Sequence, residues 1–343
     1  MRHSNVVLGL SGGVDSAVAA RLLQEEGYAV YPLWLDVGTG AGRTDAQEVA
    51  RLLDLPFAEA SIAPELERQV CAPFQADYLA GRTPLPCARC NPTVKFPALL
   101  RYADQIGADF VATGHYARVR DGRLYKGQPA NDQSYLLSRL TRAQLQRVLF
   151  PLGDYEKAQV RQLAEADSLP VAHKKDSMEI CFIPDGDYAA WLDRTGQTPP
   201  PGPFVDRTGK VLGTHKGIHH YTLGQRRGLG ISAAARLFVS AIRPETNEVV
   251  LSLGDDLQSS TVLCTEPNWL SIPELTAPLS VTVRLRHSRV ESSATLYPEG
   301  ECVRVELDTP GRAPTPGQLA VFYDGDLVVG SAWISEAKRD MKG

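Results

Sequence analysis

The stretch Gly9-Leu10-Ser11-Gly12-Gly13-Val14-Asp15-Ser16 decides the fold predicted for this chain. It follows a short apolar run at residues 5–9 and precedes an alanine- and leucine-rich run at residues 16–23, which ends near Gly27. The first run is typical of a buried strand and the second of a helix. Glycines between a strand and a helix let the backbone approach an anion, and the helix amides point toward that anion. The stretch therefore predicts a phosphate-binding loop, with a glycine-rich turn that binds no ligand as the alternative.

Polar side chains within this loop sharpen the prediction. Ser11 and Ser16 supply hydroxyl donors, and Asp15 is a carboxylate that could hold a magnesium ion. The loop has no lysine at the place where a Walker loop requires one. This excludes the phosphate loop of a GTPase or a kinase.

The first part of the chain alternates between predicted strands and helices. Residues 28–37, 56–62 and 109–113 read as strands, and Asp45 and Asp154 stand where they could cap helices. The helix after Asp45 would place these residues on its apolar face: Ala46, Val49, Ala50, Leu52 and Leu53. Such alternation predicts an α/β domain with a parallel sheet and helices on both faces.

The rest of the chain reads differently. Residues 116–126 carry a β-hairpin signal around Asp121-Gly122. The proline-rich stretch 198–203 marks a boundary, and short strands separated by glycines follow it. From about residue 258 the pattern alternates: Val281, Val283 and Leu285 on one face, Thr282, Arg284 and Arg286 on the other. We expect no helix after residue 260, a C-terminal β-barrel, and domains at 1–197, 198–257 and 258–343.

Composition limits the class of protein. The 343 residues are 43% hydrophobic and 22% charged, as in an ordinary globular protein, and 36 basic against 40 acidic residues give a net charge of −4. This balance argues against coating nucleic acid through bulk charge, although it allows a local basic patch. No apolar run approaches the roughly 18 to 20 residues of a membrane-spanning helix. The N-terminus lacks a signal-peptide layout, so we expect a cytoplasmic protein with no membrane partner.

Cysteines supply the second candidate site. The segment Pro86-Cys87-Ala88-Arg89-Cys90-Asn91 has the C-x-x-C spacing that suits a metal or thiol exchange. A zinc site needs two further ligands at matching spacing, which the chain lacks, so we expect no metal ligands here. Two buried structural cysteines are the alternative, but a proline-flanked polar loop is a poor place to bury them. Cys181, within residues 176–182, would by itself be a small core residue.

Several motifs, in their order along the chain, carry a resemblance to a known family. Ser11 to Ser16 resembles the loop of the PP-loop ATP pyrophosphatases, which split ATP to AMP and pyrophosphate while adenylating a substrate oxygen. Together with the cysteine segment, the chain is similar to the bacterial tRNA-specific 2-thiouridylases through residues 113–118, 132–137, 180–182 and 217–230. The resemblance runs from residue 9 to about residue 330.

This resemblance implies a fold and a reaction. The fold would be an N-terminal PP-loop domain of the adenine nucleotide alpha hydrolase-like class, a small central β-rich domain and a C-terminal β-barrel. The reaction would be ATP-dependent 2-thiolation of the wobble uridine of tRNA, with adenylation of the C2 oxygen and sulfur transfer from a cysteine persulfide. The implied cofactors are ATP and Mg²⁺. The implied partners are tRNA and a persulfide donor, either a cysteine desulfurase or a sulfur-relay protein. The chain itself would be a monomer.

The resemblance also implies roles for individual residues. Leu35 and Gly114 would join the residues of the loop in binding ATP. Cys90 would be the nucleophile and Cys181 the persulfide carrier, and these two would form a disulfide after transfer, with Cys87 in a supporting role. The implied tRNA contacts are Leu85, Pro86, Cys87, His115, Asn131, Asp132, Gln133, Arg284, Leu285, Arg286 and Gln318.

Three other interpretations stay open. Another PP-loop ligase or amidotransferase would have no use for Cys90 together with Cys181. A thiolase that depends on an iron–sulfur cluster would ligate the cluster through Cys87, Cys90 and Cys181, an interpretation that we do not favour. A tRNA-binding module without catalysis would not need an intact loop at residues 11–16.

Overall fold

The computed structural model describes residues 4–175, 180–233 and 235–339. The chain forms two compact units, each described below by itself. Unit 1 comprises Met1–Val70, Pro86–Pro184 and Gly325–Val329, and unit 2 comprises Cys71–Leu85, Asp185–Asp324 and Gly330–Gly343. The predicted division at residues 1–197, 198–257 and 258–343 stays a prediction, and Asp176 to Glu179 lie outside the described residues.

Unit 1 is built on a parallel sheet of five strands in the order β3-β2-β1-β4-β7. The strands are β1 (Asn5–Gly9), β2 (Ala29–Asp36), β3 (Ala58–Ser61), β4 (Phe110–Thr113) and β7 (Val148–Leu149). In the register of the sheet, Gly9 lies opposite Leu33 of β2 and Thr113 of β4, so the carboxyl ends of these strands share one edge. The predicted parallel sheet is confirmed.

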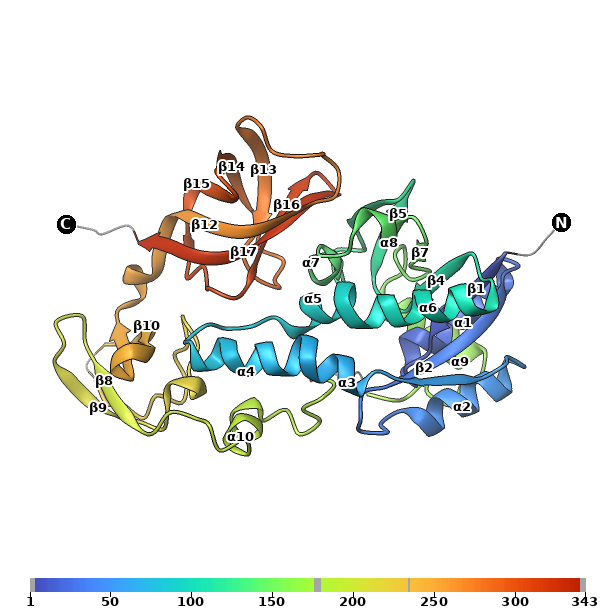
Figure 1. Cartoon of the computed structure of the whole chain (residues 1–343), viewed down its shortest axis with the longest axis horizontal. Helices are drawn as coiled ribbons and strands as arrows, with labels where there is room; N and C mark the ends of the chain where they lie inside the picture. Colours follow the sequence, from blue (N-terminus) through green and yellow to red (C-terminus); the bar gives the residue numbers. More distant parts are fainter. Residues whose placement is uncertain (1–3, 176–179, 234, 340–343) are drawn as a thin grey trace. The chain divides into compact units, whose positions relative to one another are not determined.

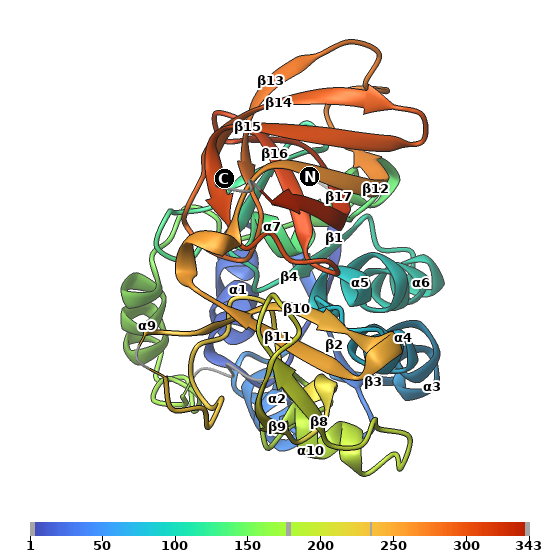
Figure 2. The same cartoon turned by 90° about the vertical axis from the view of Figure 1, so that its left-hand side faces the viewer.

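Helices cover both faces of this sheet, as predicted. The helices α1 (Val14–Glu25), α2 (Arg43–Leu52) and α9 (Lys157–Ala166) share one hydrophobic cluster with the sheet. The helix α6 (Phe96–Ile106) lies on the opposite face (Figures 1 and 2). Three alanines of α1, Ala17, Ala19 and Ala20, have no exposed surface, because small side chains let the helix approach the sheet closely.

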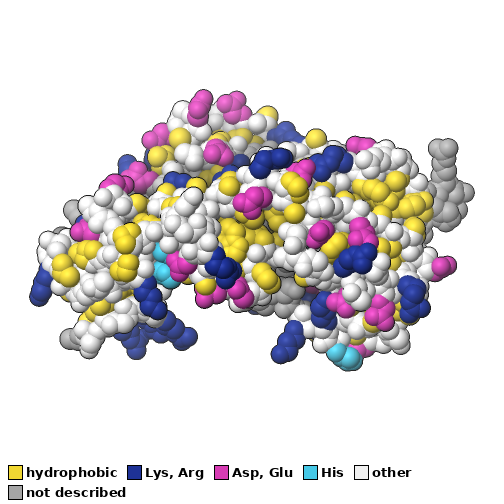
Figure 3. Space-filling view, turned by 60° about the horizontal axis from the view of Figure 1, so that its bottom comes forward, with side chains coloured by type: hydrophobic (Ala, Val, Ile, Leu, Met, Phe, Trp, Pro, Cys, Tyr) yellow, Lys and Arg dark blue, Asp and Glu magenta, His cyan; other side chains and the backbone are white. Residues whose placement is uncertain are grey.

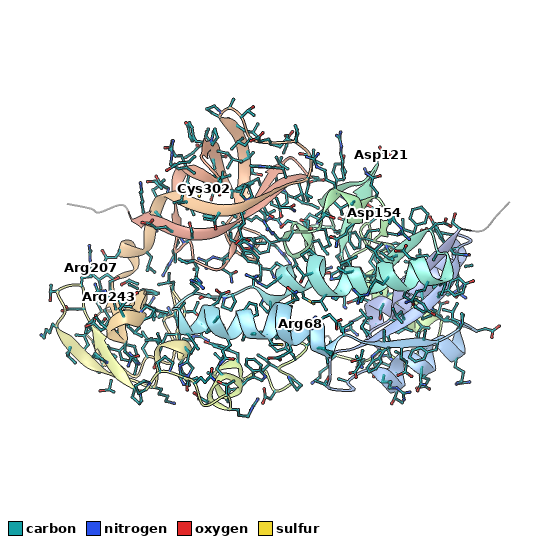
Figure 4. The ribbon with its side chains drawn as sticks, in the orientation of Figure 1. Arg68, Asp121, Asp154, Arg207, Arg243 and Cys302 are labelled. Carbon is teal, nitrogen blue, oxygen red and sulfur yellow. The ribbon has the colours of Figure 1, made fainter. Side chains whose placement is uncertain are left out.

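Two predicted helix caps are wrong. α2 begins at Arg43 after Gly42, whose φ is 79°, so Asp45 lies inside the first turn, and Leu52 is 45% exposed rather than apolar-facing. α9 begins after Glu156, which forms a reciprocal capping box with Gln159 and leaves no capping role for Asp154. The Asp154 carboxylate instead accepts a hydrogen bond from Arg118 (Figure 4).

The cysteine segment is helical, which corrects the predicted loop. α5 (Pro86–Cys90), a π-helical turn η2 (Asn91–Lys95) and α6 follow one another without a break. Pro86 is tolerated because it opens α5, where its missing N–H would have no helical partner. Pro92 lies in the π-helical turn, an irregular helix type that recurs at functional sites.

The remaining elements of unit 1 are short. The predicted hairpin is confirmed as β5 (Ala117–Arg120) and β6 (Arg123–Lys126). Asp121 and Gly122 have φ values of 51° and 67°, as a two-residue hairpin turn requires. Asp121 is labelled at this hairpin in Figure 4. The other helices are α3 (Ala63–Leu66), α7 (Ser134–Leu137) and α8 (Arg142–Leu145), and the π-helical η1 (Glu67–Cys71) ends where unit 2 begins.

Unit 2 is mostly β-structure. It contains the helices α4 (Ala72–Leu79) and α10 (Tyr188–Asp193) and a sheet in the order β10-β11-β8-β9. The strands of this sheet are β8 (Gly202–Val205), β9 (Val211–His215), β10 (Phe238–Arg243) and β11 (Glu248–Ser252), with 3₁₀ turns at η3 (Ile218–His220), η4 (Pro244–Thr246) and η5 (Gly254–Leu257).

A closed barrel follows in the order β12-β15-β14-β13-β16-β17, and pairing of β12 with β17 closes it. Its strands are β12 (Gln258–Trp269), β13 (Leu279–Arg284), β14 (Ser292–Glu299), β15 (Cys302–Arg312), β16 (Leu319–Asp324) and β17 (Leu327–Arg339). Both predicted β-rich parts are confirmed, and residues 260–339 contain no helix, as expected.

Two surface properties complete the description. Basic and acidic side chains are interspersed on the face seen in Figure 3, in keeping with the net charge of −4. Among the described residues, no helix has both the length and the apolar character needed to cross a membrane.

Candidate nucleotide and thiol site

The phosphate-loop candidate lies at the carboxyl edge of the parallel sheet. It leaves β1 beside β4, where the strand order reverses, and such a crevice is the usual ligand site of an open α/β sheet. Gly13 is the N-cap of α1, so no side chain occupies the amides of the first helical turn. These amides and the positive end of the helix dipole favour an anion at this place.

Glycines at two positions allow a backbone approach that a side chain would block. Gly12 has a φ of 75°, and a Cβ there would lie 2.2 Å from the carbonyl oxygen of Gly42. A Cβ on Gly114, just after β4, would lie 2.8 Å from the backbone of both Asp15 and Ser16. The structure thus brings Gly114, predicted from the resemblance alone, against the loop. Leu35 is half-buried near the same edge, in the strand next to β1.

The two hydroxyls of the loop differ in their surroundings. Ser16 is buried, and its hydroxyl donates to the Gly13 carbonyl at 3.0 Å while accepting from the Ser11 N–H at 3.1 Å. Ser11 is exposed. Ser16 therefore braces the loop, and Ser11 is the hydroxyl that a ligand can reach.

Two lysines that the sequence analysis missed contact the loop. Lys157 Nζ donates to both carboxylate oxygens of Asp15, at 2.7 and 2.8 Å, and the Tyr116 hydroxyl donates to Oδ1 at 2.6 Å. Lys174 Nζ donates to the Gly12 carbonyl at 2.8 Å and pairs with Asp45. Both lysines lie more than 140 residues from the loop in sequence. No local motif could have revealed them.

This arrangement bears on the magnesium prediction for Asp15. Lys157 donates to both oxygens of the carboxylate, so a metal ion at Asp15 would compete with the Lys157 ammonium. Magnesium sites at nucleotides commonly use one or two carboxylates together with the substrate phosphates. Asp15 fits that pattern as a single carboxylate ligand.

The three predicted thiols belong to one neighbourhood in unit 1. Cys90 is buried at the end of α5, whereas Cys87, one turn earlier, and Cys181 are exposed, and none is bridged. Burial raises the pKa of the Cys90 thiol to about 11, opposed by the charge and the N–H of Lys95 and reinforced by Cys181 and Cys87. Electrostatic interactions weaken with distance, so these thiols and Lys95 lie close to Cys90. The structure therefore brings together the cysteines that the sequence predicted to act together.

Cys181 is perturbed by the same neighbours. Although its residue is exposed, partial burial of the sulfur raises the pKa of the Cys181 thiol. The ammonium of Lys95 opposes this rise, and a Cys87 thiolate adds to it. Lys95, at the end of η2, is thus a cation close to both predicted catalytic thiols, and the sequence analysis did not single it out.

The thiols are not gathered as closed metal sites are. Within the described part of the chain, one set of three metal-ligating side chains has its donor atoms within 4.8 Å of one another: Asp193, His219 and His220 of unit 2. It contains no cysteine. There the buried His219 ring lies 2.9 Å from the carboxylate of Asp193, at the end of α10.

His115 connects the loop to the thiols. It directly follows Gly114, and its ring stacks on Phe96, while its Nδ1 lies 2.7 Å from the Thr113 hydroxyl. Desolvation, together with the charge of Lys95, holds the pKa of His115 well below its ordinary value. His115 is therefore a neutral, half-buried ring at neutral pH.

Two other predicted tRNA contacts in unit 1 bind their own chain. The Asp132 carboxylate accepts from the backbone N–H groups of Gly127 and Ser134. The Gln133 side chain accepts from the backbone N–H of Tyr116 at 3.0 Å. Asn131, just before them, is half-buried, as is Leu85 in unit 2, and Pro86 is buried at the start of α5.

The predicted contacts on the barrel differ from the expectation of one polar strand face. Arg284 is buried, donates to Glu291 at 2.7 Å, and lies over the Tyr323 ring. β13 ends at Arg284, so Leu285 and Arg286 lie beyond the strand, where Arg286 donates to the Arg312 carbonyl. Alternation already fails at the last residue of the strand, because Arg284 is buried like its neighbour Val283, and it cannot continue beyond the strand end. Gln318 donates to the carbonyl of Thr83 at 2.9 Å, which places it beside the segment that leads to Leu85.

Comparison with known protein families shows which family each part of the chain matches. The tRNA methyl transferase HUP domain matches residues 4–185, the tRNA methyl transferase PRC-barrel domain residues 190–253, and the aminomethyltransferase beta-barrel domain residues 259–334. Fold and site therefore define a HUP-class nucleotide-binding enzyme followed by two β-domains.

Individual relatives narrow this class. The tRNA-specific 2-thiouridylase MnmA of Lachnoclostridium phytofermentans is 44% identical over 96% of this chain and 99% of its own length. That of Desulfitobacterium hafniense is 42% identical over 96% and 97%. The solved NMN synthetase of Francisella tularensis matches with a TM-score of 0.34 and 23% identity over 51% of this chain and 67% of that chain. The chain belongs to the tRNA-specific 2-thiouridylase family, a family of tRNA sulfurtransferases.

Proposed function

We propose that this chain thiolates C2 of the wobble uridine of tRNA, using ATP to activate the C2 oxygen and a persulfide on Cys181 as the sulfur source. One observation supports this most strongly. A phosphate-loop candidate and the three thiols occur in the same compact unit, where burial raises the pKa values of Cys90 and Cys181, and the adjacent residues Gly114 and His115 link the loop to the thiols.

The first step is adenylation. Oxygen is a poor leaving group at C2, so the C2 oxygen attacks the α-phosphate of ATP and pyrophosphate departs. The loop amides, Ser11, Leu35 and Gly114 bind ATP in this scheme. Mg²⁺ bound to the phosphates would neutralise charge on the departing pyrophosphate, with Asp15 as the protein carboxylate that would hold it.

The second step moves sulfur. The terminal sulfur of the Cys181 persulfide attacks C2, and AMP leaves. The Cys90 thiolate then attacks Sγ of Cys181, which breaks the bond to the transferred sulfur and forms a Cys90–Cys181 disulfide. The transferred sulfur is reduced to the thione while the two cysteines are oxidised, so the electrons balance. A dithiol reductant must reopen the disulfide before the next turnover.

The surroundings of Cys90 explain how this order can be maintained. Burial keeps its thiol protonated at neutral pH, because its pKa is raised to about 11. A protonated Cys90 does not attack the persulfide before the substrate arrives. Lys95 is the cation available to stabilise the thiolate when it forms.

The tRNA would contact both units. The contacts proposed in unit 1 are Pro86, Cys87, His115, Asn131, Asp132 and Gln133, and those in unit 2 are Leu85, Arg284, Leu285, Arg286 and Gln318. A neutral aromatic ring such as His115 is a suitable surface for an unstacked base. We also propose that the chain works as a cytoplasmic monomer supplied by a cysteine desulfurase or a sulfur-relay protein.

A direct assay tests the proposal. The full chain is incubated with unmodified tRNA, ATP, Mg²⁺ and a persulfide donor, and digested nucleosides are analysed by mass spectrometry. We expect 2-thiouridine, AMP and pyrophosphate. ADP and phosphate in their place, or no thiolated nucleoside, would contradict the proposal. Activity that depends on a visible iron–sulfur chromophore after anaerobic purification would replace the persulfide scheme.

A further inference from the structure

We propose that Lys157 and Lys174 are the cations of the phosphate site and bind the triphosphate of ATP and the pyrophosphate that it releases. The lysine within a Walker loop binds the β- and γ-phosphates, and Lys157 and Lys174 would have the same role at this loop. The inference rests on the proposed function only in that ATP is the nucleotide. Its test uses inorganic pyrophosphate alone.

The contacts of Lys157 place a positive charge at the loop. Lys157 is the first residue of α9, and its ammonium reaches Asp15 within the loop through two short hydrogen bonds. The side chains of Lys157 and Asp15 are 21% and 32% exposed, so the pair remains accessible to solvent and to a ligand. The loop therefore has a cation, supplied by a distant helix, beside its uncapped helix amides.

Lys174 places a second positive charge at the loop, from a different segment of the chain. Its ammonium donates to the Gly12 carbonyl and pairs with Asp45 of α2. Arg161 donates to the Lys174 carbonyl and so fixes the backbone at this lysine. Gly12 and Asp15 both belong to the loop, so the two ammonium groups reach it from two separate segments of the chain.

The partners of the lysines show what a phosphate group would change. Without a ligand, the Lys157 ammonium pairs with the carboxylate of Asp15, and the Lys174 ammonium pairs with that of Asp45. A polyphosphate carries more negative charge than a single carboxylate and attracts these ammonium groups more strongly. Asp15 and the phosphates would therefore compete for Lys157, and Asp15 would become available to a metal ion when the phosphates win.

Binding of inorganic pyrophosphate to the full chain, measured by calorimetry at neutral pH with EDTA present, tests the proposal. Lys157→Met and Lys174→Met should each weaken binding about 10- to 100-fold, the usual effect of losing a hydrogen bond to a charged group. Lys157→Arg should retain most of the affinity. Arg21→Met is the matched control. Arg21 lies on α1 and is also paired with carboxylates, but its partners are Glu25 and Asp167 rather than Asp15 or Asp45. It should leave the affinity unchanged.

Asp15→Asn separates a binding role from a bracing role. If Lys157 binds phosphate, removing its competitor should tighten pyrophosphate binding in EDTA. If Lys157 only braces the loop, Asp15→Asn should weaken binding or leave it unchanged, which would overturn the proposal. This readout does not depend on the Met variants being folded. Unchanged affinity in folded Lys157→Met and Lys174→Met would also overturn it. Wild type that binds pyrophosphate in this way but makes no thiouridine would refute the function and leave this inference standing.

Discussion

At the scale of single residues, Cys90 and Cys87 are one helical turn apart and differ in chemistry. Cys90 is buried with a pKa raised to about 11, whereas Cys87 is exposed. Burial favours the neutral thiol, so its contribution to stability is present below the ordinary thiol pKa and is lost as the pH rises toward about 11. The Cys90 thiol should therefore stay protonated at neutral pH.

Alkylation measures this difference. With iodoacetamide at neutral pH, we expect Cys87 to react well before Cys90, and the rate at Cys90 to rise steeply as the pH approaches about 11. Peptide mapping assigns each modified site, and Cys90→Ser provides the control. Equal rates at neutral pH would mean that Cys90 is not buried in solution.

The catalytic division between the thiols is a second prediction at this scale. Cys181→Ser should accept no persulfide sulfur and make no thiouridine, yet still bind ATP and tRNA. Cys90→Ser should accept sulfur on Cys181 and then stall, because the resolving thiol is missing. After one turnover without reductant, mass mapping of the wild type should find a Cys90–Cys181 disulfide. A Cys87–Cys90 bridge would count against this assignment.

Sequence reasoning found the residues whose chemistry is local and missed those supplied by the fold. Gly12, Asp15 and the cysteines stand in short motifs, so they could be predicted. Lys157 and Lys174 reach the loop only because α9 packs beside α1 and because Lys174 lies next to Asp45. The burial of Arg284 depends on Glu291 and Tyr323, which no alternating pattern reveals.

At the scale of elements, the turn from β1 into α1 depends on Gly12, and Gly107, which ends α6, offers a comparison. Gly12 has both a positive φ and a crowded Cβ position, whereas Gly107 has a φ of 69° with nothing within 4 Å. Gly12→Ala should therefore destabilise the chain by about 1–3 kcal/mol more than Gly107→Ala does. It should also abolish pyrophosphate formation, which Gly107→Ala should not.

Thermal melts measure the predicted loss of stability in Gly12→Ala, and release of labelled pyrophosphate measures the predicted loss of activity. Gly114→Ala extends the test, because its Cβ would meet the backbone of Asp15 and Ser16 at 2.8 Å without any strain in φ. It should behave like Gly12→Ala. An active, stable Gly114→Ala would mean that β4 and the loop are not packed as described.

Element prediction succeeded where pattern and turn chemistry agree. The strands β1 to β4 of the parallel sheet and the hairpin at Asp121-Gly122 follow directly from apolar runs and a two-residue turn, whereas the two-residue strand β7 was not predicted. The cysteine segment was predicted as a loop because prolines flank it, yet a proline at the start of a helix breaks no hydrogen bond. The cap predictions failed at Asp154 because the Glu156–Gln159 box competes for the same helix start.

At the scale of the whole molecule, net charge and tRNA binding must be reconciled. The chain carries a charge of −4, so any RNA affinity must come from local cations. Arg286→Ala should weaken tRNA binding and reduce the slope of its salt dependence by about one. Arg284→Ala should do the same and also lower the melting temperature, because Glu291 and Tyr323 lose their buried partner.

Filter binding over a salt series, combined with thermal melts, separates these two arginines. A slope unchanged in both variants would remove the barrel from the proposed RNA surface. Arg207→Ala, which breaks an exposed ion pair with Asp256 outside the proposed contacts, serves as the control and should leave the slope unchanged (Figure 4).

Gly42 extends the constraint on the loop beyond its motif. A Cβ at Gly42 would lie 2.3 Å from the carbonyl oxygen of Ser11, just as a Cβ at Gly12 would meet Gly42. In a saturation mutagenesis library selected for thiolated tRNA, Gly42 should therefore tolerate as few substitutions as Gly12, although no sequence signature includes it. Gly40, two residues earlier, has open space around its Cβ position and should be the more permissive site.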